Sequence, residues 1–76
     1  MIRVRLYGLL RLETGLRGIE TEAATVKEVL AALEAAGVPA KALKGSAVLV
    51  NGSPAKSRTR LCDGDTVQLI PPVAGG

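Results

Sequence analysis

The chain has 76 residues, of which 47% are hydrophobic, and a formal net charge of +3, which predicts one small globular domain. It contains no apolar run long enough to span a bilayer and no recognisable signal peptide, so we expect a soluble cytoplasmic protein. The chain contains no histidine and a single cysteine, Cys62. This composition disfavours a metal site, an intrachain disulfide and imidazole-based catalysis. If the protein takes part in chemistry, we expect it to be a substrate or a carrier.

Residues 2–22 predict a strand, a short helix and a second, weaker strand. Apolar and polar side chains alternate over residues 2–7, which is typical of a half-buried strand. The expected inward residues are Ile2, Val4 and Leu6, and the expected outward residues are Arg3, Arg5 and Tyr7. Residues 8–15 predict one or two helical turns that end at Gly15. In the weaker strand over residues 16–22, Gly18 indicates a bulge or an edge position.

The clearest pattern is an amphipathic helix over about residues 26–36. Thr25 and Glu28 have the spacing of a capping box at its start. Apolar side chains then recur with helical spacing and form one stripe, made of Val26, Val29, Leu30 and Leu33. Gly37 is expected to end the helix in the left-handed conformation, and Pro39 prevents its continuation.

The remaining elements expected are a helical turn over residues 39–43 closed by Gly45, a short buried strand over 47–50, a return strand over 53–58 and a last strand over 66–70. Asn51 and Gly52 supply the positive φ values of a tight hairpin turn. Pro54 places the return strand at a sheet edge. Residues 63–65 predict a turn, and we interpret Cys62 just before it as a small buried side chain rather than a reactive thiol.

This order of elements predicts an α+β domain of the β-grasp type over residues 1–70, in which one main helix packs on one face of a mixed sheet. The first and last strands are expected as parallel neighbours in the middle of the sheet. The other face of the sheet is then open to solvent or to a partner.

Residues 71–76 predict an extended tail. Pro71 and Pro72 favour a stiff polyproline conformation, and Gly75 and Gly76 carry no side-chain bulk. This stretch has no charged side chain and no nucleophile, so the reactive group expected in it is the α-carboxylate of Gly76. Such an arm can enter a narrow tunnel in the active site of a partner.

Over essentially its whole length, the chain resembles the ubiquitin-like sulfur carriers of the MoaD/ThiS family, and within them the small subunit of molybdopterin synthase. The residues that carry the resemblance are the strand that starts at Met1-Ile2-Arg3-Val4, the helical insert after it, Val50-Asn51, Asp63-Gly64-Asp65 and Pro71-Pro72-Val73-Ala74-Gly75-Gly76. The Pro-Pro-Val sequence and the helical insert look more like the molybdopterin branch than the thiamine branch.

The resemblance implies a role in molybdenum cofactor biosynthesis as the non-catalytic, sulfur-donating subunit. An adenylating, E1-like enzyme would use ATP to convert the carboxylate of Gly76 to an acyl-adenylate, and a sulfur donor would replace AMP to leave a thiocarboxylate. The tail would then enter the large subunit of molybdopterin synthase and give its sulfur to a pterin precursor. The chain itself would bind no cofactor, as expected of a group carrier.

The resemblance also implies that partners dock on the open face of the sheet. Tyr7 and Ile70 have the strand parity to lie there, and Pro54 is a candidate addition. The expected partner-binding residues are Tyr7, Pro54, Ile70, Pro71, Pro72, Val73, Ala74 and Gly75, with Gly76 as the reacting residue.

Several alternatives stay open at this point. The chain can be a sulfur carrier for thiamine or for tRNA thiolation, a covalent modifier that links Gly76 to lysines, or an interaction module. Five basic and no acidic residues lie between Lys41 and Arg60, which indicates a solvated face or a docking surface for an acidic partner. Nucleic acid binding is disfavoured because Tyr7 is the only aromatic residue available for stacking.

Overall fold

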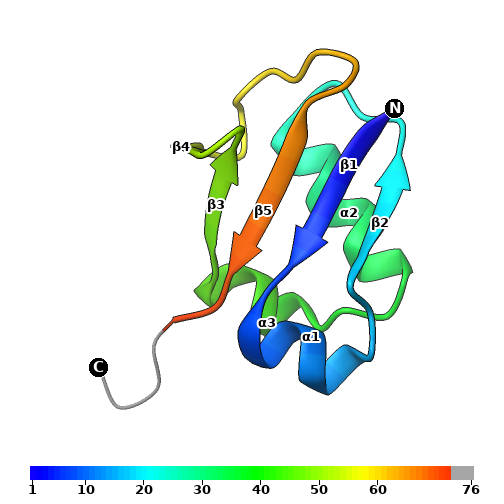
Figure 1. Cartoon of the computed structure of the whole chain (residues 1–76), viewed down its shortest axis with the longest axis vertical. Helices are drawn as coiled ribbons and strands as arrows, with labels where there is room; N and C mark the ends of the chain where they lie inside the picture. Colours follow the sequence, from blue (N-terminus) through cyan, green and yellow to red (C-terminus); the bar gives the residue numbers. More distant parts are fainter. Residues whose placement is uncertain (73–76) are drawn as a thin grey trace.

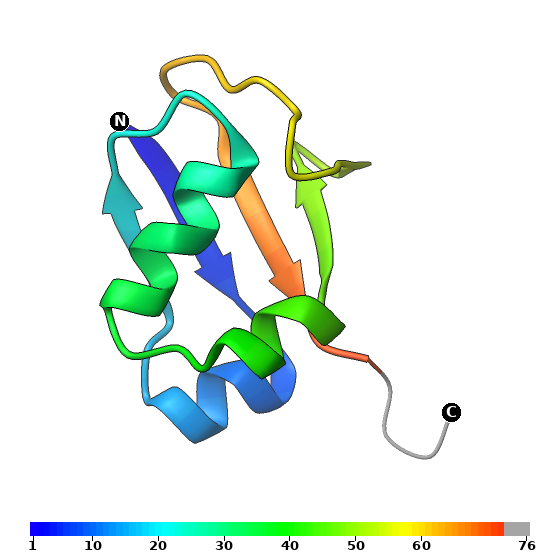
Figure 2. The same ribbon diagram turned by 180° about the vertical axis from the view of Figure 1, so that it is seen from behind.

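The computed structural model describes residues 1–72 and shows a mixed five-stranded sheet with its helices on one face (Figures 1 and 2). The elements are β1 (Ile2–Leu6), α1 (Gly8–Thr14), β2 (Gly18–Thr21), α2 (Val26–Ala35), α3 (Ala40–Gly45), β3 (Ala47–Val50), β4 (Ser53–Pro54) and β5 (Thr66–Ile70). The strand order is β2-β1-β5-β3-β4. β1 and β5 are parallel and the other neighbours are antiparallel, which confirms the predicted β-grasp arrangement.

The core lies between the sheet and α2, and its residues follow the alternation expected of half-buried strands. β1 buries every second residue, and Val67 and Leu69 of β5 lie opposite Val4 and Leu6 in the parallel register. On α2, the side chains of Val26, Val29 and Leu33 are fully buried, and that of Leu30 is partly buried against them, so the predicted stripe is confirmed.

Both ends of α2 follow their sequence signals. The hydroxyl of Thr25 accepts a hydrogen bond from the backbone N–H of Glu28 at 3.4 Å. The Glu28 carboxylate reaches back one residue further than expected and accepts from the N–H of Ala24 at 3.4 Å. Gly37, with a φ of 106°, takes the left-handed conformation after the helix.

The predicted return strand over residues 53–58 is wrong in length, because β4 contains only Ser53–Pro54. The chain after it turns toward the start of α2 instead. There the carbonyl oxygens of Ser57 and Thr59 accept hydrogen bonds from the N–H groups of Lys27 and Val26, at 2.9 and 3.0 Å. The first turn of a helix has no internal partner for these donors, so this loop satisfies them.

β3 is only partly buried, whereas the sequence predicted a buried strand. Val48 and Val50 pack against the core, while Ala47 and Leu49 belong to the opposite face of the sheet. As predicted, Asn51 and Gly52 form the turn that follows, with φ values of 50° and 85°.

The turn over residues 62–65 is tied to this hairpin by side-chain hydrogen bonds. Asn51 donates to one carboxylate oxygen of Asp65 at 3.0 Å, and the N–H of Cys62 donates to the other at 2.8 Å. These bonds stabilise the charged form, the one from Cys62 most, and lower the pKa of Asp65. Asn51 also accepts from the N–H of Thr66, so it links three segments.

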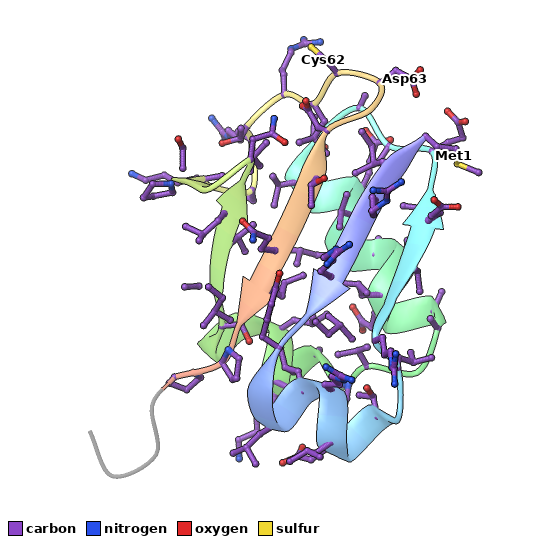
Figure 3. The ribbon with its side chains drawn as sticks, viewed as in Figure 1. Met1, Cys62 and Asp63 are labelled. Carbon is purple, nitrogen blue, oxygen red and sulfur yellow. The ribbon has the colours of Figure 1, made fainter. Side chains whose placement is uncertain are left out.

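Cys62 is exposed, which corrects the prediction that it is buried. It lies on the loop at the end of the molecule that carries Met1 and Asp63 (Figure 3). The preceding residue, Leu61, packs against the core instead, so the turn directs the cysteine outward. The ammonium group of Met1 pairs with the carboxylate of Asp63 beside this loop.

α1 and α3 lie at the end of the sheet where β1 and β5 finish, next to the first residues of the tail (Figure 2). A Cβ atom on Gly8, which has a φ of 56°, would lie 3.0 Å from the Cγ of Pro71. A Cβ atom on Gly45 would lie 4.0 Å from the Cγ of Pro72. The two prolines are thus flanked by the start of α1 and the end of α3.

Leu33→Ala tests the placement of the core. Because Leu33 is fully buried, the substitution should lower the free energy of unfolding by about 2–5 kcal/mol, measured by urea denaturation. Leu12→Ala removes the same atoms from a side chain that is 77% exposed. This variant should change the free energy of unfolding by less than about 0.5 kcal/mol. Equal effects of the two variants would contradict the assigned core.

Gly8→Ala tests how the tail begins. The positive φ of Gly8 and the close Cγ of Pro71 should make an alanine there destabilising by about 1–2 kcal/mol. Gly45→Ala is the matched control, because α3 accepts a Cβ at ordinary contact distance there. We expect its unfolding midpoint to be unchanged or raised; a loss equal to that of Gly8→Ala would refute the argument.

Candidate functional site

The open face of the sheet, opposite the helices, carries the residues expected to contact a partner. The register of the strands aligns one row of residues across this face, in the order Gly18, Arg5, Gln68, Leu49 and Pro54. Tyr7 lies two positions after Arg5, and Ile70 lies two positions after Gln68. Because side chains alternate between the faces of a sheet, both belong to the same face as Arg5 and Gln68. The fold thus assembles this surface from both ends of the chain and its middle.

Tyr7 and Ile70 are exposed at the end of the sheet where the tail begins, with exposed fractions of 36% and 38%. The side-chain amide of Gln68 donates a hydrogen bond to the Tyr7 hydroxyl at 3.3 Å, which holds the ring on the open face. The Tyr7 N–H also donates to the carbonyl of Leu69 at 3.2 Å. Tyr7 and Ile70 each follow the last residue pair between β1 and β5, Leu6 and Leu69, so both side chains lie on the open face, as strand parity predicted.

Pro54 lies on the same face but at the far edge. It is opposite Leu49 on β3, so β3 and β5 separate it from β1. Its missing N–H suits an edge strand. The structure thus brings Tyr7, Gln68 and Ile70 together and leaves Pro54 at the rim of the same surface, with Leu49 between.

The base of the tail is the second part of the site. Pro71 is half-buried and Pro72 is exposed, and both line an apolar hollow of about 330 Å³ between α1 and α3. Leu9 and Ala42 contribute to its other walls. The predicted site residues Val73, Ala74, Gly75 and Gly76 lie outside the described residues.

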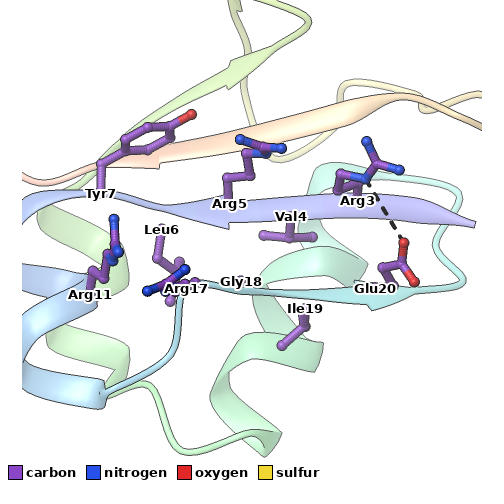
Figure 4. Close-up of a pocket in the computed structure, with 10 residues that line it drawn as sticks. All are labelled: Arg3, Val4, Arg5, Leu6, Tyr7, Arg11, Arg17, Gly18, Ile19 and Glu20. Atoms are coloured by element: carbon purple, nitrogen blue, oxygen red, sulfur yellow. Dashed lines mark ion pairs between the residues drawn. The ribbon is translucent and has the colours of Figure 1, made fainter.

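A third feature was not predicted from the sequence. Four arginines line a shallow hollow of about 540 Å³ at the β1–β2 edge of the open face: Arg3, Arg5, Arg11 and Arg17 (Figure 4). We call this the arginine hollow. Arg3 and Arg5 project from β1 on the side of Tyr7, whereas Arg11 comes from α1 and Arg17 from the segment before β2. One feature could have indicated the hollow. β2 runs antiparallel to β1, so Arg17, the residue just before β2, lies beside the end of β1.

The basic segment noted in the sequence does not form one patch. Lys41 and Lys44 lie on α3, at the end of the sheet from which the tail leaves. Lys56, Arg58 and Arg60 lie in the loop after β4, at the opposite end (Figure 1). A continuous surface for nucleic acid is therefore not built from residues 41–60.

Within residues 1–72, no group of three or more His, Cys, Asp or Glu side chains is arranged to hold a metal ion. In the same part of the chain, every helix is too short or too polar to cross a bilayer.

Comparison with known proteins agrees with this architecture. The chain superposes on SAMP1 from Haloferax volcanii with a TM-score of 0.87, at 28% identity over 99% of this chain and 98% of that one. It superposes on a chain of the complex of subunits 1 and 2 of the molybdopterin-converting factor from Helicobacter pylori with a TM-score of 0.77. The identity there is 29%, over 99% of this chain and 97% of that one. The chain also superposes on a chain of the BexX/CysO complex from Amycolatopsis orientalis with a TM-score of 0.81, at 29% identity over 100% of both chains.

A comparison with curated proteins found no match. The model of the ThiS family, however, matches residues 4–76, which is nearly the whole chain. Together with the β-grasp fold and the similarity to solved sulfur carriers, this match places the protein: the chain belongs to the ThiS family of ubiquitin-like sulfur carriers and modifiers.

Proposed function

We propose that the chain is the sulfur-carrying small subunit of a molybdopterin synthase, and that its reacting group is the carboxylate of Gly76. The observation that carries this proposal is the full-length similarity to a chain of the Helicobacter pylori molybdopterin-converting factor, at 29% identity over 99% of this chain. The base of the tail supports it, because Pro71 and Pro72 leave the body between α1 and α3.

The proposed chemistry has two steps on the same carbonyl carbon. First, a carboxylate oxygen of Gly76 attacks the α-phosphorus of ATP on an adenylating, E1-like enzyme, and pyrophosphate leaves. Hydrosulfide, released by a sulfur donor, then attacks the acyl carbon. The bond between this carbon and the oxygen of AMP breaks, and AMP leaves. The product is a thiocarboxylate, in which sulfur replaces one oxygen.

The partner enzymes supply the groups that activate these steps. The chain has no histidine, and its cysteine lies on the loop beside Met1 and Asp63, at the end of the molecule away from the tail (Figure 3). A carboxylate is a poor electrophile until its oxygen becomes a good leaving group, so adenylation by ATP is the enabling step. In the large subunit of molybdopterin synthase, the thiocarboxylate would give its sulfur to a pterin precursor. Water would then supply the oxygen that returns the end of the chain to a carboxylate.

A covalent protein modifier is the second candidate, and one observation favours it. The chain superposes with a TM-score of 0.79 on a Haloferax volcanii protein described as a small archaeal modifier protein. The same acyl-adenylate would then be attacked by the amine of a lysine, and the bond formed would be an amide. Carriers for thiamine or for tRNA thiolation would share the thiocarboxylate and differ in the molecule that accepts the sulfur.

Intact mass spectrometry tests the reaction at Gly76. We expect incubation with the cognate adenylating enzyme, ATP and a sulfur donor to yield a product with one oxygen replaced by sulfur, located on the C-terminal peptide. Deleting Gly76, or adding one residue after it, should abolish the product, because the activated carbon is then missing or displaced. Gly75→Val should also block it, since a β-branched side chain restricts the backbone.

Two results would count against this chemistry. Sulfur gained at the end of the extended chain would refute the geometric part of the proposal. A wild-type protein found joined to lysines, and never as a thiocarboxylate, would replace the carrier by the modifier.

Tyr7→Asp and Ile70→Asp test docking on the open face. Both side chains are exposed, so a carboxylate there should weaken binding to the large synthase subunit by at least about tenfold, measured by calorimetry. The thermal midpoint should stay nearly unchanged. Leu12→Asp is the control, because Leu12 is exposed but lies on α1 rather than on the sheet. If Leu12→Asp weakens binding as much, or if Tyr7→Asp unfolds the chain, the open face is not the docking surface.

A further inference from the structure

We propose that the arginine hollow binds an acidic segment of the protein that docks on the open face. The inference rests on the proposed docking of a partner there, and it adds the chemistry and the position of one part of the contact. The hollow has a volume of about 540 Å³, and four arginine side chains line it.

The hollow exists because the edge strand leaves space beside β1. Arg5 pairs in register with Gly18, which has no side chain. Glycine is required at this position, since a Cβ atom would clash with the carbonyl oxygen of Val4. The side chains of Arg11 and Arg17 close the end of the hollow nearest α1 (Figure 4).

The charge in the hollow is mostly uncompensated. Arg3 pairs with Glu20 of β2, with 3.9 Å between the guanidinium nitrogen and the carboxylate oxygen. Within residues 1–72, Arg5, Arg11 and Arg17 form no ion pair. Three neighbouring cations without a counter-charge create a local positive potential, which attracts an anionic ligand.

The ligand chemistry follows from the guanidinium groups and from their surroundings. The planar fork of arginine matches a carboxylate, which it binds with two parallel hydrogen bonds. A carboxylate is already present at the β2 edge, because an oxygen of Glu20 lies 3.9 Å from a guanidinium nitrogen of Arg3. Acidic side chains of a partner that approach Arg5, Arg11 and Arg17 would form closer, hydrogen-bonded pairs with them.

The surface beside the hollow favours a protein over a nucleic acid. The open face continues from Arg5 to Gln68, Leu49 and Pro54, and Tyr7 lies at its end. Tyrosine and arginine next to apolar residues are typical of protein interfaces. A nucleic acid would find a single aromatic ring to stack on in the whole chain. Chains similar to this one were solved in protein–protein complexes, which agrees with a protein ligand.

The position of the hollow gives the acidic segment a distinct role. It lies toward the β1–β2 edge, while the apolar residues lie over β5 and β3. A partner that meets both regions can dock in only one orientation about the sheet normal. Charge pairs at the rim then speed association and fix the orientation, whereas the apolar contacts supply most of the affinity.

The experiment uses the full chain and two synthetic peptides. One peptide alternates Glu and Leu, and its counterpart alternates Gln and Leu, which removes the charge and keeps the size. Binding is measured by fluorescence anisotropy, and the contacted residues are identified from the Nε–Hε signals of arginine in NMR spectra of the labelled protein. We expect the Glu peptide to bind at least about tenfold more tightly than the Gln peptide and to shift Arg5, Arg11 and Arg17.

Two double variants with the same change in net charge locate the binding site. Arg5→Glu with Arg17→Glu should weaken binding of the Glu peptide by at least about tenfold. Arg58→Glu with Arg60→Glu reverses two charges in the loop after β4, at the end of the sheet opposite the tail. This variant should weaken binding of the Glu peptide by less than about threefold, measured at a salt concentration that screens distant charges. All four side chains are exposed, so the fold should be retained, which circular dichroism checks.

Other outcomes would overturn the proposal. Equal losses in the two double variants would show non-specific attraction by net charge. Shifts of the same arginines by inorganic phosphate, with no preference for the Glu peptide, would identify a small-anion site. Tighter binding of a short oligouridine than of the Glu peptide would identify a nucleic acid surface. Because peptide binding does not involve Gly76, it succeeds or fails independently of the sulfur-loading experiment.

Discussion

The parallel pairing of β1 with β5 is the constraint on which the rest of the structure depends. Parallel neighbours cannot be joined by a tight turn, so the chain between them must cross a face of the sheet, and α2 makes this crossing. Because both strands run in the same direction, both end at the same edge of the sheet. β1 continues there into Tyr7 and α1, and β5 into Ile70 and the two prolines. The first and last strands thus bring Tyr7 to the same end of the sheet as Ile70 and the base of the tail, although 63 positions separate Tyr7 from Ile70 in the sequence.

The fold could be predicted from the sequence wherever local chemistry is decisive. Alternation over β1, the capping box at Thr25 and the positive φ values at Asn51 and Gly52 each specify an element without reference to the rest of the chain. Strand parity also placed Tyr7 and Ile70 on one face. What local patterns omit is the partner of each element. The loop after β4 is irregular because its carbonyl groups bond to the first turn of α2, and no pattern within residues 53–58 indicates this.

The same limit explains the error at Cys62 and why the arginine hollow was not predicted. Cys62 was expected to be buried because small apolar side chains usually are, but Leu61 beside it takes the place in the core. The arginine hollow joins residues from β1, α1 and the segment before β2, so its members are neighbours only after the sheet has formed. The five basic residues at 41–60 are all exposed, which agrees with solvated positions. The fold divides them between two ends of the molecule, so they do not form the single docking surface that was the second interpretation.

Under the proposed function, the partner enzymes supply the activating groups, so the carrier achieves specificity through its position, and its geometry sets a narrow tolerance. Under the proposed function, four residues separate Pro72 from the reacting carboxylate, and four residues span at most about 14 Å. The reacting centre of any partner must therefore lie within that distance of the body. A rotation of the docked body about the sheet normal would displace the base of the tail, because the base lies at one end of the sheet. Apolar contacts resist such a rotation weakly because they are not directional, whereas charge-assisted hydrogen bonds fix it. A basic site offset from the apolar patch is therefore what a short tail requires, since it is orientation, more than affinity, that decides whether the end of the chain reaches the reaction.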